Sequence, residues 1–108
     1  MEEEKTGSEN IQLGGNIELV GFKELDGGSM IILKKMIGNH VKKYSETAKN
    51  FEKLTVSMKK IGGGDNKFEI NAKVIDNGTS YTSEVTDFNL FFTMDKVLTK
   101  IQTQLDSA

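Results

Sequence analysis

Cysteine, proline, arginine and tryptophan are all missing from this sequence of 108 residues, and histidine occurs once. Without cysteine the chain can form no disulfide, no thiolate metal site and no cysteine nucleophile. Without arginine it cannot bind a base or a phosphate through a bidentate guanidinium. With His40 alone, no pair of histidines can hold a metal, and any catalytic triad would depend on this one residue.

Long apolar runs are missing as well. None approaches the roughly 18 residues of a membrane span, and Met1 is followed by three glutamates rather than by a secretory signal. We expect a soluble, cytoplasmic protein that does not bind membranes. Residues 1–12 lack apolar periodicity and predict a disordered acidic tail. Residues 13–108 are expected to form a single domain, which the length and the 36% hydrophobic content suit.

The net charge of −2 hides a basic segment. Residues 1–10 carry four glutamates and one lysine, so the remaining chain has a net charge of +1. Residues 34–60 carry eight lysines and two glutamates, which gives this segment a net charge of +6. Such a segment is either a solvated face or a surface that binds a polyanion.

Periodicity predicts a strand and a helix in the first half of the domain. Residues 16–22 alternate in character and are rich in strand-forming side chains. Asp26 or Ser29 is expected to cap a helix from Met30 to about Ser45, because its side-chain oxygen can accept an orphan backbone N–H. The apolar residues of this helix recur every three or four positions and predict one buried stripe, formed by Met30, Leu33, Ile37, Val41 and Tyr44.

Three more strands and a second helix are predicted in the other half. Residues 54–58 and 68–74 alternate apolar and polar side chains, and the loop IGGGDN (61–66) joins them as a hairpin. Asn77-Gly78 predicts a tight turn with positive φ before a strand that carries Tyr81, Ser83 and Val85. Thr86 or Asp87 is expected to cap the last helix. Its buried stripe is Leu90, Met94, Val97, Leu98, Ile101 and Leu105.

The order β-α-β-β-β-α predicts an α+β sandwich, a four-stranded sheet with two helices packed on one face. The first strand, helix and next strand form a right-handed crossover, which places the helix on one side of the sheet. Because each strand has only one apolar side, both helices are expected on that side. The other face is expected to be polar, with Thr55, Ser57, Lys59, Glu69, Asn71, Lys73, Thr82 and Glu84.

The motifs do not form a catalytic centre. His40, at the edge of the first helix, is typical of a structural or solvent-facing histidine. GGGD lacks the spacing of a phosphate-binding loop, and Asn77-Gly78-Thr79 is explained by its turn rather than by glycosylation. Capping and the helix dipole account for the acids at helix starts, Asp26, Asp87 and Asp95. We expect no enzymatic activity, no cofactor, no metal and no small-molecule substrate.

The lysines of the first helix form a candidate binding ridge. Lys35, Asn39, Lys42 and Glu46 lie opposite the stripe through Ile37, with Lys43 beside them, and the heads of Lys35, Asn39 and Lys42 line up along one ridge. The ridge could contact phosphates, and each lysine neutralised would add roughly one unit to the salt dependence of binding. Amphipathic helices of unrelated proteins show the same pattern, so a solvated face remains an alternative. Without arginine, any RNA contact would be to the backbone and not specific for bases.

Two phenylalanines form a second candidate contact. Phe91 and Phe92 are neighbours, and side chains of neighbours on a helix point about 100° apart. Phe91, beside Leu90 and Met94, is assigned to the core, whereas Phe92 and Phe88 point away from it. This pair is either partly buried or contacts a protein partner or an unpaired RNA base. The alternative function is therefore a protein-interaction module that uses Phe88, Phe92 and the open sheet edge.

From Asn71 onward an alternating strand is followed by Gly78, Ser83-Glu84, NLFFTMD (89–95) and KIQTQL (100–105). This order resembles the ribosome hibernation-promoting factor family, also known as protein Y or ribosome-associated inhibitor. That family has a glycine turn, a small residue before Glu, Asp-Met-Tyr-Ala-Ala-Ile-Asp at the start of the last helix, and a Lys-Leu-x-x-Gln-Leu ending. Asn89 stands where the family has Asp. The first helix, KKMIGNHVKKYSE, is similar in character, and the resemblance covers nearly all of residues 16–106.

The resemblance implies a protein that binds the small ribosomal subunit in the channel used by mRNA and tRNA and silences idle ribosomes. Longer members of the family carry a further C-terminal domain that pairs ribosomes, and this chain is expected to act as a short form. Its contacts would be to the backbone of ribosomal RNA, made from both helices. By position, the contacting residues are Lys35, Lys42, Lys43, Lys96 and Lys100.

Overall fold

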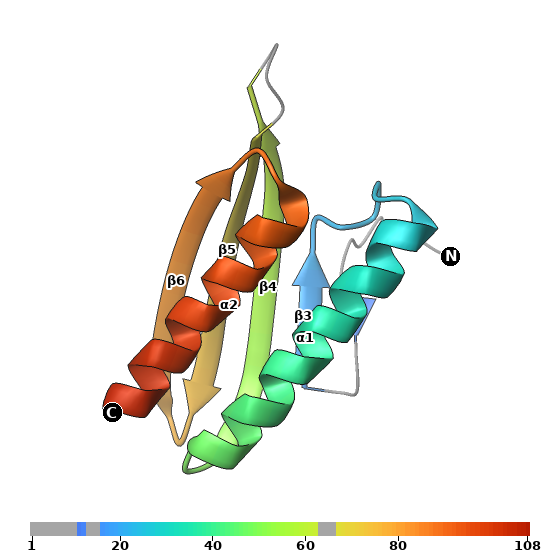
Figure 1. Cartoon of the computed structure of the whole chain (residues 1–108). Coiled ribbons are helices and arrows are strands. Elements are labelled where there is room, and N and C mark those ends of the chain that lie inside the picture. The colour runs from blue at the N-terminus through green and yellow to red at the C-terminus, as the bar shows by residue number, and fades with distance from the viewer. Residues whose placement is uncertain (1–10, 13–15, 63–66) are drawn as a thin grey trace.

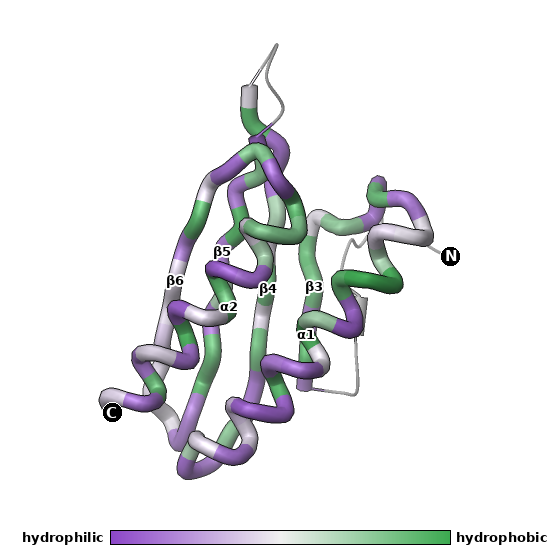
Figure 2. The backbone as a smooth tube through the Cα atoms, in the orientation of Figure 1, coloured by the Kyte–Doolittle hydropathy of each residue, from purple (hydrophilic) through white to green (hydrophobic). Residues whose placement is uncertain are grey.

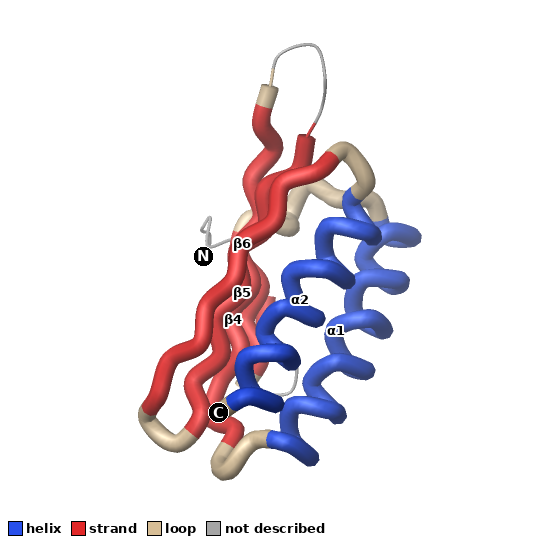
Figure 3. The backbone as a smooth tube through the Cα atoms, turned by 60° about the vertical axis from the view of Figure 1, so that its left-hand side comes forward, coloured by secondary structure: helices blue, strands red, loops and turns tan. Residues whose placement is uncertain are grey.

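One sheet, covered on one face by two helices, makes up the computed structural model, which describes residues 11–12, 16–62 and 67–108 (Figures 1 and 3). The helices are α1 (Gly27–Thr47) and α2 (Leu90–Ser107). The strands, in their order across the sheet, are β2 (Ile11–Gln12), β3 (Ile17–Val20), β4 (Phe51–Ile61), β5 (Lys67–Asp76) and β6 (Thr79–Asp87). The predicted α+β class is confirmed.

The pairing of the strands follows the predicted order. β3 and β4 are parallel, with α1 as the crossover between them, and all other neighbouring strands are antiparallel. The β-α-β-β-β-α arrangement, with a four-stranded sheet and both helices on one face, is therefore confirmed for β3 to β6. The two helices run in the same direction and begin at the same end of the molecule (Figure 1).

A short extra strand changes the predicted start of the domain. Ile11 and Gln12, which the sequence assigns to the disordered tail, pair with Leu19 and Glu18 of β3. The backbone groups on the free edge of β3 need hydrogen-bond partners, and β2 supplies them. The tail boundary at residue 12 is thus corrected. The rest of the predicted tail, residues 1–10, and positions 63–66 of the predicted hairpin loop lie outside the described residues.

The hydrophobic core lies between the sheet and the helices. Along β4 and β5 hydrophobic and hydrophilic residues alternate (Figure 2), so that one side of each strand packs under the helices. Both predicted helix stripes face this core. Its fully buried members with the largest side chains are Leu19, Phe22, Leu33, Ile37, Tyr44, Leu54, Ile70, Met94, Leu98 and Ile101.

The cap of α1 is as predicted. The Asp26 carboxylate accepts a hydrogen bond from the Ser29 backbone N–H at 3.0 Å and one from the Ser29 hydroxyl at 2.7 Å. These hydrogen bonds lower the pKa of Asp26, because they stabilise its charged form. The helix begins at Gly27, three residues earlier than the apolar stripe indicates.

The predicted cap of α2, Thr86 or Asp87, is wrong. Strand β6 continues to Asp87, and Asn89 caps the helix by accepting a hydrogen bond from the Phe92 N–H at 2.9 Å. Asp87 accepts instead from the Phe88 N–H at 2.7 Å and so shapes the connection before the helix. All three are good capping residues, and only the end of β6 decides among them.

Three described glycines have positive φ, Gly21, Gly62 and Gly78, and two of them have a clear structural role. Asn77 and Gly78 have φ of 51° and 83°, which confirms the predicted tight turn between β5 and β6. Gly21 has φ of 84°, and a Cβ atom there would lie 2.3 Å from the Met58 carbonyl oxygen. This close approach ends β3 at Val20, two residues before the predicted end.

Candidate nucleic-acid interface

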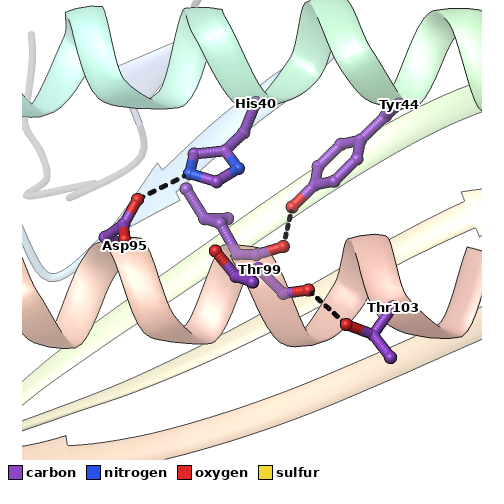
Figure 4. A network of polar contacts seen from close by, with 6 residues as sticks. His40, Tyr44, Asp95, Thr99 and Thr103 are labelled. Carbon is purple, nitrogen blue, oxygen red and sulfur yellow. Dashed lines mark hydrogen bonds and ion pairs between the residues drawn. The ribbon is translucent and has the colours of Figure 1, made fainter.

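Polar contacts at regular spacing join α1 to α2. His40 Nε2 lies 3.0 Å from Asp95 Oδ1, and the Tyr44 hydroxyl donates to the Leu98 carbonyl at 2.6 Å (Figure 4). One turn further on, the Gln102 amide donates to the Thr47 hydroxyl at 3.0 Å. In each contact the α2 residue follows its α1 partner by 54 or 55 positions, so the two helices lie side by side with a fixed register.

The middle of this contact, at Tyr44, is inaccessible to solvent. Tyr44 is fully buried, and burial raises the pKa of its hydroxyl, which therefore remains a proton donor to α2. The other ring nitrogen of His40, Nδ1, is buried and has no hydrogen-bond partner among the described residues. The His40–Asp95 pair links α1 to α2.

The outward face of α1 is basic. Lys35, Lys42 and Lys43 are all exposed. Among the described residues the ion pairs are His40–Asp95 and Lys53–Glu18, so none of these lysines is neutralised by a described carboxylate. The whole helix carries four lysines and one glutamate, a net charge of +3 with His40 neutral. The structure therefore places the predicted lysines of α1 together on one surface.

The predicted lysines of α2 face elsewhere. Lys96 and Lys100 are exposed, but Lys100 Nζ lies 3.4 Å from the Glu84 carbonyl oxygen of β6. Gln104, one turn later, donates to the Thr82 carbonyl at 2.7 Å. This side of α2 looks toward the free edge of β6, whereas Asp95 and Gln102 look toward α1. The five lysines consequently form two groups with different directions instead of one ridge.

Phe88 and Phe92 are exposed, whereas Phe91 packs against the core as predicted. The exposed fractions are 57% for Phe88 and 49% for Phe92. A lysine ammonium stands over each ring, Lys67 at 5.1 Å from the Phe88 centroid and Lys96 at 5.4 Å from the Phe92 centroid. Both distances are within the range of cation–π attraction.

Sequence reasoning missed Lys67. Its position opposite Phe88 depends on the pairing of β5 with β6, in which Phe68 lies beside Asp87. The sequence held a signal for this register, because the predicted two-residue turn at Asn77-Gly78 pairs Asp76 with Thr79, and counting back along both strands brings Lys67 level with Phe88. Reasoning from periodicity also missed Ile31 and Ile32, which are 63% and 48% exposed at the start of α1. The signal was present, since both lie off the predicted stripe of that helix. Figure 2 shows hydrophobic stretches near the start of both helices.

The open face of the sheet is polar, as predicted, and holds a shallow hollow of about 310 Å³. Glu84 lies on this face beside Glu69, whose carboxylate raises the pKa of Glu84, while Lys100 opposes that shift. The residues that line the hollow are Thr55, Ser57, Asn71, Ala72, Lys73, Thr82 and Ser83, of which Ala72 and Ser83 turn their side chains to the other face, where Ala72 joins the core and the Ser83 hydroxyl donates to the Val97 carbonyl.

The described part of the chain contains neither a cluster of metal-ligating side chains nor a membrane-spanning helix. No three histidine, aspartate or glutamate side chains there come close enough together to hold a metal ion. Neither α1 nor α2 is apolar enough over its length to cross a membrane. Comparison of the chain with protein-family models finds no match, and comparison with curated proteins finds none either.

Proposed function

We propose that this protein binds RNA through the basic face of α1 and acts as a regulator of translation on the small ribosomal subunit, in the cytoplasm. The ribosomal assignment comes from the sequence resemblance to hibernation factors. The RNA assignment is supported by one observation in particular. Lys35, Lys42 and Lys43 are exposed on one helix and have no carboxylate partner among the described residues.

The lysines of this surface suit a phosphate backbone. Lysines act as point charges, so they can neutralise phosphates without reading the bases. Lys35 and Lys42 lie along one line of the helix, which a groove of folded RNA can follow, and Lys43 points about 100° away from Lys42, beside that line. Among the described residues, α1 lies against α2 and its backbone comes close to the sheet at β4, so no described element covers its outer side.

The lysines of α2 are assigned a smaller part. Lys96 is held over the Phe92 ring, and Lys100 is held near the Glu84 carbonyl oxygen. Binding a phosphate would require each ammonium to leave its present partner. In addition, α2 carries two aspartates as well as two lysines, so its net charge is zero.

A protein-interaction module is the second candidate, and the exposed Phe88 and Phe92 favour it. The sheet edge does not add to it. Side chains of α2 already approach two outward carbonyl oxygens of β6, those of Thr82 and Glu84. An added strand would have to displace them. A contact made by the phenylalanines alone would depend little on salt.

Cosedimentation with purified small ribosomal subunits at low and high salt tests the proposal. We expect binding that weakens steeply with salt, because each bound lysine releases counterions from the RNA. The triple variant Lys35→Gln, Lys42→Gln, Lys43→Gln should lose most of this binding.

A second triple variant controls for net charge. Lys49, Lys59 and Lys73 are exposed outside the face of α1, and their replacement by glutamine removes the same three charges. It should leave most of the binding intact. Equal losses for the two triple variants would show that only net charge matters, and would refute α1 as the binding face. Binding that does not respond to salt would favour the protein-interaction module.

A further inference from the structure

The geometry points to a site for unpaired bases at the start of α2, where Phe88 and Phe92 each present a ring face with a lysine beside it. This inference deepens the proposed function and rests on it, since it names the part of a folded RNA that this end of the molecule contacts. Folded RNA exposes single-stranded loops and bulges whose bases can stack on aromatic side chains.

Hydrogen bonds fix the backbone from which both rings project. The Phe88 N–H donates to the Asp87 carboxylate at 2.7 Å, and the Phe92 N–H donates to the Asn89 amide oxygen at 2.9 Å. Thr93, which is buried, donates its hydroxyl to the Asn89 carbonyl at 2.6 Å and fixes the same turn. A surface fixed in this way loses little conformational freedom on binding.

The lysines decide the chemistry of the partner. An apolar side chain that covered either ring would displace the ammonium of Lys67 or Lys96 and offer it nothing in exchange. An unpaired nucleotide supplies both a flat ring for the phenylalanine and a phosphate for the displaced lysine. The two lysines come from different elements, Lys67 from β5 and Lys96 from α2, yet each places an ammonium over a phenylalanine ring. Charge complementarity therefore selects nucleic acid over an apolar protein surface.

The basic face of α1 and the phenylalanine pair then contact different parts of the RNA. The lysines of α1 contact the backbone of any folded RNA, whether its bases are paired or not. Phe88 and Phe92 engage only RNA that offers unpaired bases, because paired bases in a duplex stay stacked on one another. The rings can stack on any unpaired base without distinguishing its identity, and the sequence contains no arginine to read base edges.

Two RNA probes of equal charge test the inference. One is a hairpin with an unpaired loop, and the other is a fully paired duplex with the same number of phosphates. The wild-type protein should bind the hairpin more tightly. Phe88→Ala and Phe92→Ala should each weaken hairpin binding by about tenfold, since a stacked base contributes roughly that much. Neither should change duplex binding. Thermal unfolding checks that both variants fold.

Leucine variants sharpen the test, because Phe88→Leu and Phe92→Leu keep apolar bulk but remove the ring face. They should weaken hairpin binding to the same extent as the alanine variants. Hairpin binding that survives both phenylalanine substitutions, while the lysine triple variant still weakens both probes, overturns this inference and leaves the proposed function standing. Failure of the wild type to bind either probe overturns both. If the phenylalanine variants lose binding to intact subunits but still bind deproteinised ribosomal RNA, the rings contact a ribosomal protein. That result also overturns the inference.

Discussion

Two helices cover the same face of the sheet, and they differ in burial and in charge. α2 buries Leu90, Thr93, Met94, Val97, Leu98, Ile101 and Leu105 among its 18 residues, and α1 buries only Leu33, Ile37 and Tyr44 among its 21. α2 lies over β5 and β6, whereas α1 packs chiefly against α2. The net charge is zero for α2 and +3 for α1.

This difference separates stability from binding. The side chains of α2 are largely committed to the core and to the backbone of β6, so that helix mainly holds the fold together. α1 depends on α2 for its place and contains three glycines, which are poor helix formers. The exposed side chains on its outer side make no contact with the described core, so they are available for binding. The predictions below test this division, from the largest expected effect to the smallest.

The largest effect is expected from Leu98→Ala in α2. Leu98 is fully buried, so its truncation leaves a cavity and should lower the free energy of unfolding by about 2–5 kcal/mol. Phe92→Ala, on the exposed side of the same helix, should change it by less than about 1 kcal/mol. Urea denaturation measures both. Equal losses would place Phe92 in the core and remove it from any binding site.

The next effect concerns binding and compares the helices directly. If α1 provides the main RNA contacts, the lysine triple variant of α1 should make the plot of log K against log salt shallower by about 3 units for duplex RNA. Lys96→Gln with Lys100→Gln should change the slope by less than about 1 unit, because both ammonium groups have partners within the protein. A larger change for the α2 pair would reverse the roles given to the helices.

A smaller effect is expected at the contact between the helices. Tyr44→Phe removes the hydrogen bond to the Leu98 carbonyl and should cost about 1 kcal/mol of stability. Hydrogen exchange should show the loss first in the amides of α1, because α1 can open locally while α2 stays on the sheet. Uniform loss of protection in both helices would mean that they unfold as one unit.

Periodicity predicted most of the fold. The stripes of both helices and the alternation of β4 and β5 depend only on which residues face the core. Those residues are recognised in the sequence by their apolar side chains. The end of β6 was harder. Thr86, Asp87 and Asn89 can all cap a helix, and the choice among them depends on how far β6 stays paired with β5. The pairing of Ile11 with β3 was missed because two residues carry no pattern.

The candidate site could be predicted only in part. The lysines of α1 were placed from helical spacing alone, since all of them lie on one element. The lysines of α2 were correctly expected to be exposed, but their direction depends on contacts with β6 that the sequence does not report. Lys67 reaches Phe88 across the sheet register, 21 residues away in sequence. The predicted turn at Asn77-Gly78 sets this register, so the Lys67–Phe88 contact could have been inferred, whereas the contacts of α2 with β6 depend on how the helix packs on the sheet.

The smallest effect is expected from Glu84→Gln, on the strand that α2 approaches. The neighbouring Glu69 carboxylate raises the pKa of Glu84, so the folded state disfavours the charged form of this carboxyl. The resulting destabilisation is absent below the ordinary pKa of a glutamate and develops as the pH rises through the raised one. Glu84→Gln should therefore raise Tm slightly at neutral pH and leave it unchanged in acid.

Lys100→Gln provides the matching change on α2. Lys100 opposes the pKa shift of Glu84, so its removal should leave the repulsion between Glu69 and Glu84 less compensated and lower Tm slightly at neutral pH. Thermal unfolding of both variants at neutral and acid pH measures the two effects. If Lys100→Gln has no effect on Tm at either pH, its ammonium is free in solution, and α2 would then have an unengaged lysine as α1 does. The helices would still differ in net charge, but both would then carry lysines that have no partner within the described part of the protein.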